Sequence, residues 1–268
     1  DVTITSGAQG DTITVVSEGD STVTSGAGDD TITIVGGGSN TINVGAGDDT
    51  VTGGTGNDRI VFASADFDGN DVVDGGLGTD TVVISGDGNV VDGGNMVGIE
   101  NLELDGTGVT ITSANLSTYI ASGLVSISGS ANSSEITISA GAGATVDLSG
   151  LGLTAIKSIT ATNGAAGNIK LVLSEDQINN VTTIAAGTGD TLSIQSDVAG
   201  LAALGAKAPN ATVFVVDSTE NMSANSALLT TLGATVTAAA AVTVAEAEAI
   251  LALGLTSTYD LADSAANL

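Results

Sequence analysis

Between residues 1 and 100, single aliphatic residues alternate with polar ones in triplets such as Thr-Ile-Thr, and glycine-rich stretches separate the triplets. Aligning the chain on these aliphatic residues gives nine-residue units of the form x-G-x-G-x-D-x-U-x, where U is aliphatic. Alternation is typical of strands with one buried face, and glycine allows the positive-φ conformations of tight turns. Each unit is therefore predicted to contain a turn and a three-residue strand. The units are 6–14, 16–24, 25–33, 35–43, 44–52, 53–61, 66–74, 75–83 and a degenerate one, 84–92.

The aliphatic residue of each triplet is predicted to point inward, because side chains alternate along a strand. The pentapeptide Gly-Ala-Gly-Asp-Asp occurs at 26–30 and again at 45–49, with the weaker Gly-Gly-Gly-Ser-Asn at 36–40 between them. Because the same pentapeptide returns after two units, two units are predicted to make one coil. The coils are expected to stack about 4.8 Å apart as a parallel solenoid. The predicted inward residues are Ile13, Val23, Ile32, Ile42, Val51, Ile60, Val73 and Val82.

The sixth position of alternate units falls on opposite edges of this solenoid. The first edge carries Asp11, Asp30, Asp49, Asp71 and Asn89, and the second edge carries Ser21, Asn40, Asp58 and Asp80. Stacked carboxylates about 5 Å apart repel each other unless a counterion lies between them, and oxygen ligands favour Ca²⁺. We expect several calcium ions, between Asp11 and Asp30, Asp30 and Asp49, Asp49 and Asp71, and Asp58 and Asp80. Turns at Ser21 and Asn40 lack charge and should bind calcium weakly or not at all.

Backbone carbonyls of the glycine turns are expected to complete a shell of about six to eight oxygens around each ion. The turn residues that we add to the candidate metal site are Gly26, Gly28, Asp29, Gly45, Gly47, Asp48, Gly54, Gly56, Asn57, Gly76 and Gly78.

Charge and composition narrow the function. Thirty-one acidic residues against four basic ones give a net charge of −27, which disfavours nucleic acid and anionic membranes as partners. Histidine and cysteine are absent and aromatic residues make up only 2%, so nucleophile–histidine and thiol chemistry are excluded. A paired-carboxylate hydrolase stays formally open, but the acids lie in periodic turns, and we expect no enzyme. The sequence contains no apolar run of about 18 residues, so it predicts no transmembrane segment. The opening DVTIT resembles the end of a repeat and indicates a fragment of a longer protein.

The remaining chain has a different pattern. GIENLELDGTGVTIT (98–112) keeps strand alternation without acidic turns, and further strand candidates continue to DTLSI at 190–194. Segments 201–207, 225–234 and 244–254 are predicted to be short helices closed by glycine. We therefore expect a calcium-binding roll at 1–92, a calcium-poor solenoid at 93–197, and a mixed helix and strand segment at 198–268. Asp190, in GTGDTLSI, resembles the aspartate of a single nonapeptide, but it has no stacked partner and is not included among the candidate calcium ligands.

The nonapeptides resemble the RTX repeats of proteins exported by bacterial type I secretion. This resemblance implies an all-β fold that begins as a right-handed parallel β-roll, with calcium ligands at Asp11, Asp30, Asp49, Asp58, Asp71 and Asp80. The middle region also resembles bacterial surface-layer (S-layer) proteins and large RTX adhesins. Together these resemblances imply a secreted, extracellular, cell-surface protein that folds on meeting external calcium and associates with itself or with neighbouring modules.

The function expected from these resemblances is a calcium-dependent structural module that helps to form an S-layer lattice, and two alternatives to it remain. One is an adhesin module for surface or cell attachment. The other is an ice-binding face, because outward threonine pairs such as Thr12/Thr14 and Thr31/Thr33 form T-x-T ranks, although threonine is also a good exposed strand residue.

Overall fold

The computed structural model describes residues 1–63, 65–87, 90–91, 94–107, 109–130, 135–164, 166–204, 207–208 and 210–258. The chain divides into two compact units. The first unit is Asp1–Ala140 with Leu151–Thr160, and the second is Gly141–Gly150 with Ala161–Leu268. The expected boundaries at residues 92 and 197 stay predictions.

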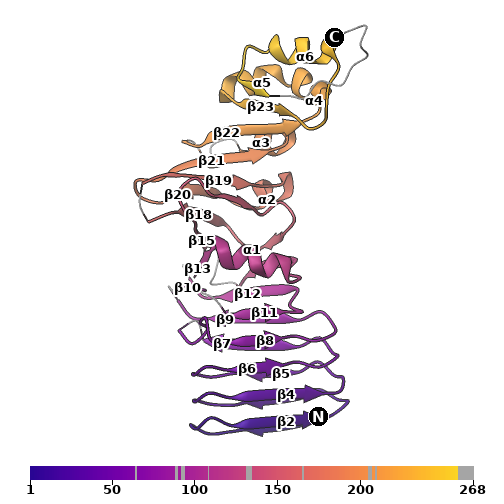
Figure 1. Ribbon diagram of the computed structural model, residues 1–268, viewed down its shortest axis with the longest axis vertical. Helices are drawn as coiled ribbons and strands as arrows, with labels where there is room; N and C mark the ends of the chain where they lie inside the picture. Colours follow the sequence, from indigo (N-terminus) through magenta and orange to yellow (C-terminus); the bar gives the residue numbers. More distant parts are fainter. Residues whose placement is uncertain are drawn as a thin grey trace. The chain divides into compact units, whose positions relative to one another are not determined.

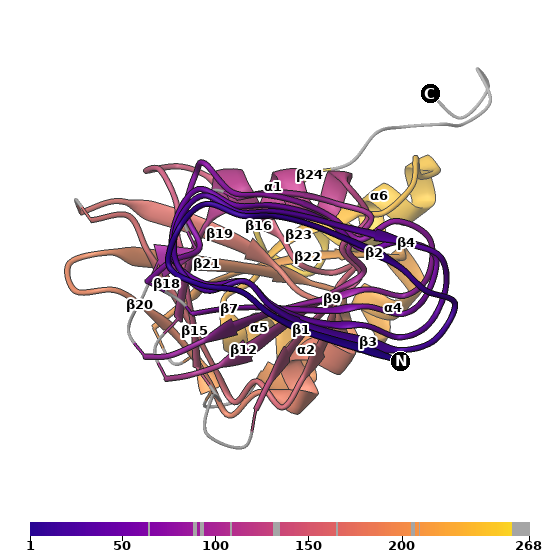
Figure 2. The same cartoon turned by 90° about the horizontal axis from the view of Figure 1, so that it is seen from below.

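The first unit begins as a solenoid of parallel strands in which consecutive strands alternate between two sheets. Figure 1 shows the coils as stacked layers in the indigo-to-purple part, and Figure 2 shows them overlying one another. The eight-stranded sheet contains, in order, β1 (Val2–Thr5), β3 (Ser21–Thr24), β5 (Thr41–Asn43), β7 (Arg59–Ala63), β9 (Thr81–Ser85), β12 (Asn101–Asp105), β14 (Ser126–Gly129) and β17 (Gly152–Thr154). The five-stranded sheet contains β2 (Thr12–Val16), β4 (Thr31–Val35), β6 (Thr50–Thr52), β8 (Val72–Asp74) and β11 (Asn95–Val97).

Strand register confirms that two units make one coil. Ile13 pairs with Ile32, which pairs with Val51, and the same alignment continues to Val73. All the predicted inward residues are buried, the most exposed being Ile13 at 8%. Several strands are five residues long rather than three and bury a second inward residue, because the chain stays extended for one more alternation. These additional core residues are Val15, Ile34, Phe62 and Ile84.

The glycines of the turns are required by the close stacking of the coils. At Gly45, a Cβ atom would lie 1.4 Å from the carbonyl oxygen of Gly26 in the preceding coil. At Gly26, a Cβ would lie 1.7 Å from the carbonyl oxygen of Gly7, and φ is +110°. Any side chain at these positions would force the coils apart and break the strand ladders, so the glycine spacing follows from the stacking distance.

The regular pattern ends after β9. In the five-stranded sheet, the strand that follows β8 is β11. The degenerate unit 84–92 therefore does not supply the next strand of the first edge. Asn89, which we assigned to that edge, lies outside the described residues. Val90 and Val91 form β10, which pairs with β13 (Val109–Thr112), and β13 pairs with β15 (Glu135–Ser139).

A helix also interrupts the region predicted to contain only strands. Helix α1 (Ser113–Ala121) follows β13 directly, with the Thr112 side chain accepting a hydrogen bond from the Asn115 N–H. It buries Leu116 and Tyr119, which are three residues apart and therefore lie on one helical face.

The second unit contains a six-stranded parallel sheet with helices in the connections. The sheet contains β16 (Thr145–Asp147), β19 (Asn168–Val172), β21 (Thr191–Ser196), β22 (Thr212–Asp217), β23 (Thr235–Ala238) and β24 (Ser257–Thr258). Strand β18 (Ser158–Thr162) begins in the first unit and ends in the second, and β20 (Thr183–Ala186) lies in the second unit. The helices are α2 (Glu175–Asn180), α3 (Val198–Leu204), α4 (Thr219–Ala224), α5 (Ser226–Leu232) and α6 (Val244–Leu251). Helices α5 and α6 confirm two of the predicted helices, and α3 overlaps the third but begins three residues earlier than 201. Helices α2 and α4 were not expected.

Within the described part of the chain, none of the helices has the length and apolar character needed to cross a membrane.

Candidate metal centre

The sixth residue of a unit lies where the glycine turn enters a strand. Its side chain is buried in the seven units from 16–24 to 75–83, whereas Asp11 of the first unit is half-buried. Asp30, Asp49, Asp58, Asp71 and Asp80 are each no more than 2% exposed. Solvent-exposed aspartate is the norm, and a fully buried one usually has a charged or hydrogen-bonding partner. The positions of these carboxylates are therefore the first indication of a site.

Hydrogen bonds connect the sixth residues into a ladder along each edge. On the first edge the Asp11 N–H donates to Asp30 Oδ1 at 2.8 Å, and the Asp30 N–H donates to Asp49 Oδ1 at 2.8 Å. The Asp49 N–H donates in turn to Asp71 Oδ1 at 3.0 Å. The second edge repeats this arrangement from Ser21 through Asn40 and Asp58 to Asp80. The register thus brings the predicted aspartates of each edge together.

Four of these carboxylates keep one oxygen without a partner. Oδ2 of Asp30, Asp49, Asp58 and Asp80 is buried and makes no hydrogen bond within the described chain. A buried anionic oxygen that lacks a donor carries a large desolvation penalty. A cation at each of these oxygens would remove that penalty.

Asp11 and Asp71 differ from these four. The Oδ2 of Asp11 accepts from the Ser6 hydroxyl and, at 3.4 Å, from the Gly7 N–H. The Oδ2 of Asp71 accepts from the Asp68 N–H at 2.7 Å. Both carboxylates are therefore better satisfied without a cation than Asp30, Asp49, Asp58 and Asp80.

On the second edge, a backbone carbonyl borders the same space as the unpartnered oxygen of Asp58. The point beside Gly53 where a Cβ would lie is 2.4 Å from the Gly75 carbonyl oxygen and 2.7 Å from Asp58 Oδ2. Within the described residues, no group of three or more Asp or Glu side chains could hold a metal ion together. An ion here would have one or two carboxylates and the Gly75 carbonyl among its ligands, an all-oxygen donor set that suits a hard cation such as Ca²⁺.

Burial shifts the titration of these acids. It raises the pKa of Asp49 and of Asp80 from 3.8 to about 6, against the lowering effect of the backbone N–H donors. The pKa values of Asp58 and Asp71 are also raised, again mainly by burial. The charged form of these carboxylates is therefore unfavourable when no cation is present. A bound cation would stabilise that form, which agrees with a metal site at these residues.

Asn40 replaces one carboxylate by an amide, and its hydrogen bonds show the consequence. Its Nδ2 donates to Asp58 Oδ1 at 2.7 Å and to the Gly38 carbonyl at 3.2 Å, and its side chain is buried. The amide therefore offers Asp58 a donor where a second aspartate would offer only repulsion.

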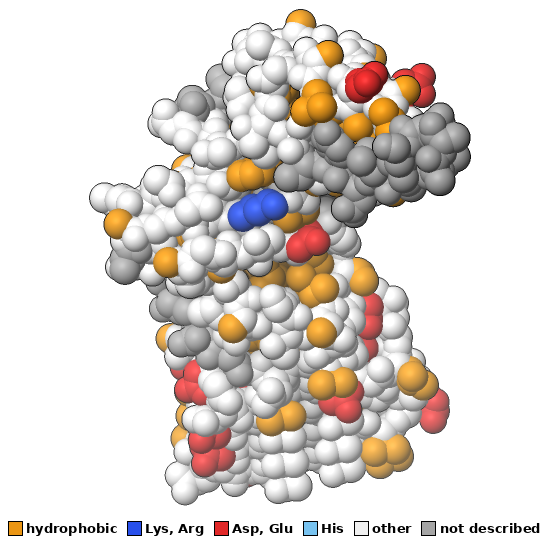
Figure 3. All heavy atoms as spheres, turned by 45° about the horizontal axis from the view of Figure 1, so that its top comes forward, with side chains coloured by type: hydrophobic (Ala, Val, Ile, Leu, Met, Phe, Trp, Pro, Cys, Tyr) orange, Lys and Arg blue, Asp and Glu red, His pale blue; other side chains and the backbone are white. Residues whose placement is uncertain are grey.

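The other predicted turn residues occupy different places. Asp29, Asp48 and Asn57 are exposed, and their Oδ1 atoms accept hydrogen bonds from the neighbouring coil, outside the buried ladders. In Figure 3, acidic side chains lie on both lateral margins of the lower part of the molecule, which contains the repeats. The predicted glycines with positive φ are Gly26, Gly28, Gly47, Gly54, Gly76 and Gly78, whereas Gly45 and Gly56 are confined by stacking alone.

Sequence reasoning missed one acid of the second ladder. Glu100, in the segment expected to lack acidic turns, accepts a hydrogen bond from the Asp80 N–H through Oε2 at 2.8 Å. The signal that could have found it is the spacing. Glu100 follows Asp80 by 20 residues, close to the separations of 18 to 22 residues between sixth positions on this edge.

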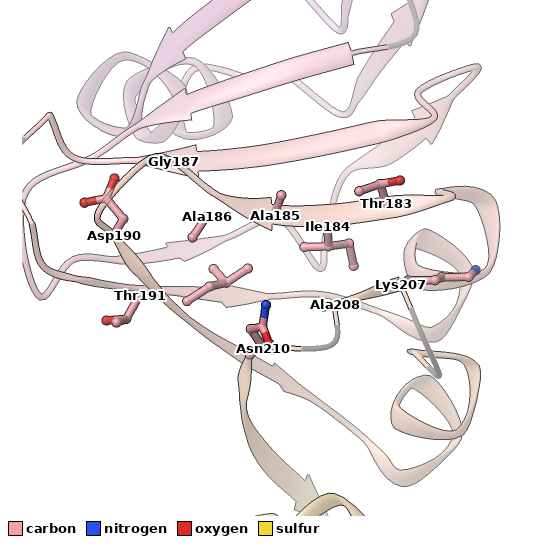
Figure 4. A pocket seen from close by; sticks show the side chains of 12 residues that line it. Thr183, Ile184, Ala185, Ala186, Gly187, Asp190, Thr191, Lys207, Ala208 and Asn210 are labelled. Carbon is pink, nitrogen blue, oxygen red and sulfur yellow. The ribbon is translucent and has the colours of Figure 1, made fainter.

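Asp190 belongs to the second unit, where it lies beside a cavity of about 500 Å³. Figure 4 shows its carboxylate at one end of this cavity and Lys207 at the other. Its Oδ2 accepts from Thr162 Oγ1 and the Asn163 N–H, while its Oδ1 is buried without a partner in the described chain. Among the described residues, the donors to its carboxylate are Thr162 and Asn163 and not the backbone of a second stacked acid, so Asp190 is not part of a ladder.

Comparison with known proteins agrees with the geometry of the first unit. Residues 6–33, 34–64 and 67–82 match a family model of the RTX calcium-binding nonapeptide repeat. No curated protein and no solved structure matches the chain. RTX repeats bind Ca²⁺, are structural rather than catalytic, and are typical of proteins secreted by the type I route. Between residues 6 and 82 the chain therefore carries a calcium-binding β-roll of RTX nonapeptide repeats, as its resemblance predicts.

Proposed function

We propose that this chain is a calcium-dependent structural module of a bacterial cell-surface protein, and that it contributes to an S-layer lattice. The observation that carries the calcium dependence is the pair of ladders with four buried, unpartnered carboxylate oxygens. A protein that stacks such groups without a cation would lose much of its stability. External calcium makes the same stack a source of stability, so the fold forms where that ion is abundant.

The proposed ions lie between successive aspartates. The strongest candidates are the Asp30–Asp49 pair on the first edge and the Asp58–Asp80 pair on the second, because all four have an unpartnered Oδ2. Pairs that include Asp11 or Asp71 have more internal hydrogen bonds and rank lower. When bound, calcium supplies positive charge and oxygen coordination. The protein supplies fixed carboxylates and turn carbonyls such as that of Gly75.

Replacing Asn40 with Asp is expected to raise the number of bound calcium ions by one and to make folding more calcium-dependent. The substitution removes the amide donor to Asp58 and adds a second buried carboxylate, which repels Asp58 until an ion separates them. Equilibrium dialysis counts the ions, and circular dichroism in EGTA measures the loss of structure. Ser39→Asp is the matched control, since it adds the same charge at an exposed neighbour. An unchanged ion count in Asn40→Asp would contradict a cation site on this edge.

Association with other copies is supported by the surface of the roll. Val16 is 76% exposed and Val35 49%, and the two are paired in register at the ends of β2 and β4. A further exposed apolar residue, Leu77, is 71% exposed. Calcium would also reduce the repulsion between chains of net charge −27. Lateral contact between calcium-loaded rolls is therefore the proposed mode of assembly.

The test is electron microscopy of the purified chain with millimolar calcium, alongside sedimentation in solution. Ordered two-dimensional arrays that dissolve in EGTA are expected. A monomer that instead binds cell or mineral surfaces in a calcium-dependent manner would favour the adhesin alternative. A calcium-loaded monomer that forms no array and binds no surface would refute both.

The ice-binding alternative has weaker support. The threonines of β2, β4 and β6 pair in register, as in the row Thr12, Thr31 and Thr50. The next strand continues that row with Val72 and the parallel row with Asp74. Three coils form a small array, and exposed threonine in a strand needs no further explanation.

A further inference from the structure

The second-edge ladder continues for one coil beyond the matched repeats. Strand β12 pairs with β9 so that Asn101 lies opposite Thr81, which places Glu100 opposite Asp80. The N–H groups of Glu100 and Asn101 both donate to the Asp80 carbonyl, at 3.2 and 3.0 Å. Glu100 therefore occupies the place that the sixth residue of another unit would have, although its sequence context is not a nonapeptide.

Gly98 completes the same geometry. Its coil stacks on that of Gly75, because the Gly75 N–H donates to the Val97 carbonyl at 3.0 Å. The point beside Gly75 where a Cβ would lie is 2.2 Å from the Gly98 carbonyl oxygen and 2.6 Å from Asp80 Oδ2. The corresponding separations at Gly53, within the repeats, are 2.4 and 2.7 Å. The arrangement of a carbonyl and a carboxylate oxygen therefore recurs one coil later.

The orientation of Asp80 points independently to a ligand. Its side chain is fully buried, and its Oδ1 is used by the Asp58 N–H. Its Oδ2 has no partner and faces the space that it shares with the Gly98 carbonyl. Glu100 supplies a second negative charge next to Asp80, because its Oε2 accepts a hydrogen bond from the Asp80 N–H at 2.8 Å.

We propose that Asp80, Glu100 and the Gly98 carbonyl hold a further divalent cation, of the size and hardness of Ca²⁺, outside the nonapeptide repeats. Glu100 follows Gly98 by two positions, whereas Asp80 follows Gly75 by five. The longer side chain of glutamate offsets this shorter turn. The inference depends on calcium binding by the repeats and is independent of assembly on a surface.

This site would couple the calcium-loaded roll to the strands that follow it. Glu100 directly precedes β12, whose Leu102 pairs with Val82 on one side and Ile127 on the other, all three fully buried. An ion that fixes Glu100 against Asp80 thus also fixes the start of β12, from which β14 and β17 continue the sheet. Calcium would therefore order strands that contain no repeat of their own.

Glu100→Gln tests the site in the full chain. Glutamine keeps the size of the side chain and an oxygen that can accept from the Asp80 N–H, so the substitution removes mainly the charge. We expect one fewer bound calcium ion at saturation by equilibrium dialysis. We also expect weaker calcium-induced protection of the β12 amides in hydrogen exchange, with protection of β4 and β6 retained.

Glu135→Gln is the matched control, because Glu135 is exposed at the start of β15. Glu103 is unsuitable, since it forms a bidentate ion pair with Arg59 at 2.6 and 2.9 Å. A wild-type ion count and wild-type affinity in Glu100→Gln would overturn the site while leaving the proposed function intact. If Glu100→Gln lost its strand structure even with calcium, Glu100→Asp would decide. With the charge kept and the side chain shortened, it should retain the ion at lower affinity, and unchanged affinity would overturn the site.

Discussion

Chelation of calcium with EGTA is expected to unfold the roll between residues 6 and 82. Asp30, Asp49, Asp58 and Asp80 are at most 2% exposed, and each keeps one oxygen without a partner. The penalty for burying an uncompensated ion is several kcal/mol even after relaxation. Four such penalties are together comparable with the whole stability of a typical domain, about 5–15 kcal/mol. Residues 1–100 carry 17 acids and one base, and this charge further opposes compaction.

Far-UV circular dichroism and small-angle scattering measure this change. In EGTA we expect loss of strand signal and an increase in radius, both reversed by millimolar Ca²⁺. The same concentration of Mg²⁺ is the control, because this smaller ion requires stricter octahedral geometry and keeps its waters. The loss should be confined to the first unit, since the described part of the second unit has no aspartate ladder. Equal strand content in EGTA and in calcium would contradict calcium-driven folding.

The roll was predictable because its pattern is local and repeated. Each nonapeptide specifies a turn by its glycines and an inward residue by its single aliphatic position. The separation of 19 residues between Asp30 and Asp49 then follows from two such units per coil. The structure confirms the pairing of these two residues and the burial of Ile32 and Val51 between the sheets.

The helices of the middle region were not predictable in the same way. Helix α1 has the sequence SANLSTYIA, in which serine, threonine and asparagine also favour turns, and only Leu116 and Tyr119 are buried. Its formation depends on packing rather than on intrinsic propensity. Helix α2 did carry a recognisable signal. Ser174 and Gln177 form a capping box, which is a helix start even in a segment of only six residues.

Glu100 shows what a motif search omits. Its side chain belongs to the aspartate ladder only through the register of β9 with β12, which the local sequence does not specify. The unpartnered oxygens are likewise a property of stacking. The sequence identifies Asp58 and Asp80 as acids at equivalent positions. Only the structure shows that one oxygen of each is used by a backbone N–H or side-chain donor and the other by none.

Lowering the pH is expected to stabilise the calcium-free roll and to weaken the binding of calcium. Burial raises the pKa of Asp49 and Asp80 from 3.8 to about 6 in the folded chain, above the value in the unfolded chain. The folded state therefore binds more protons than the unfolded state between these two values. The contribution of these groups to stability is fully present below pH 3.8 and is lost as the pH rises through about 6. In EGTA, strand content should thus be higher at about pH 5 than at neutral pH.

Calcium binding should show the reverse dependence, because an ion and a proton compete for the same carboxylate. Below about pH 6, affinity is expected to fall by about tenfold per pH unit for each proton displaced. Calorimetric titration at several pH values, in buffers of different ionisation enthalpy, measures both the affinity and the protons released.

The double variant Asp49→Asn, Asp80→Asn separates these two carboxyls from the general effect of lowering the negative charge. Each asparagine keeps an oxygen that can accept from the neighbouring backbone N–H, but it has no titratable proton. In EGTA, the variant should have more strand structure at neutral pH than the wild type and should respond less to acid. It should also bind fewer calcium ions. If the double variant kept the full pH response of the wild type, acid would be acting through the overall charge of −27 and not through the ladders.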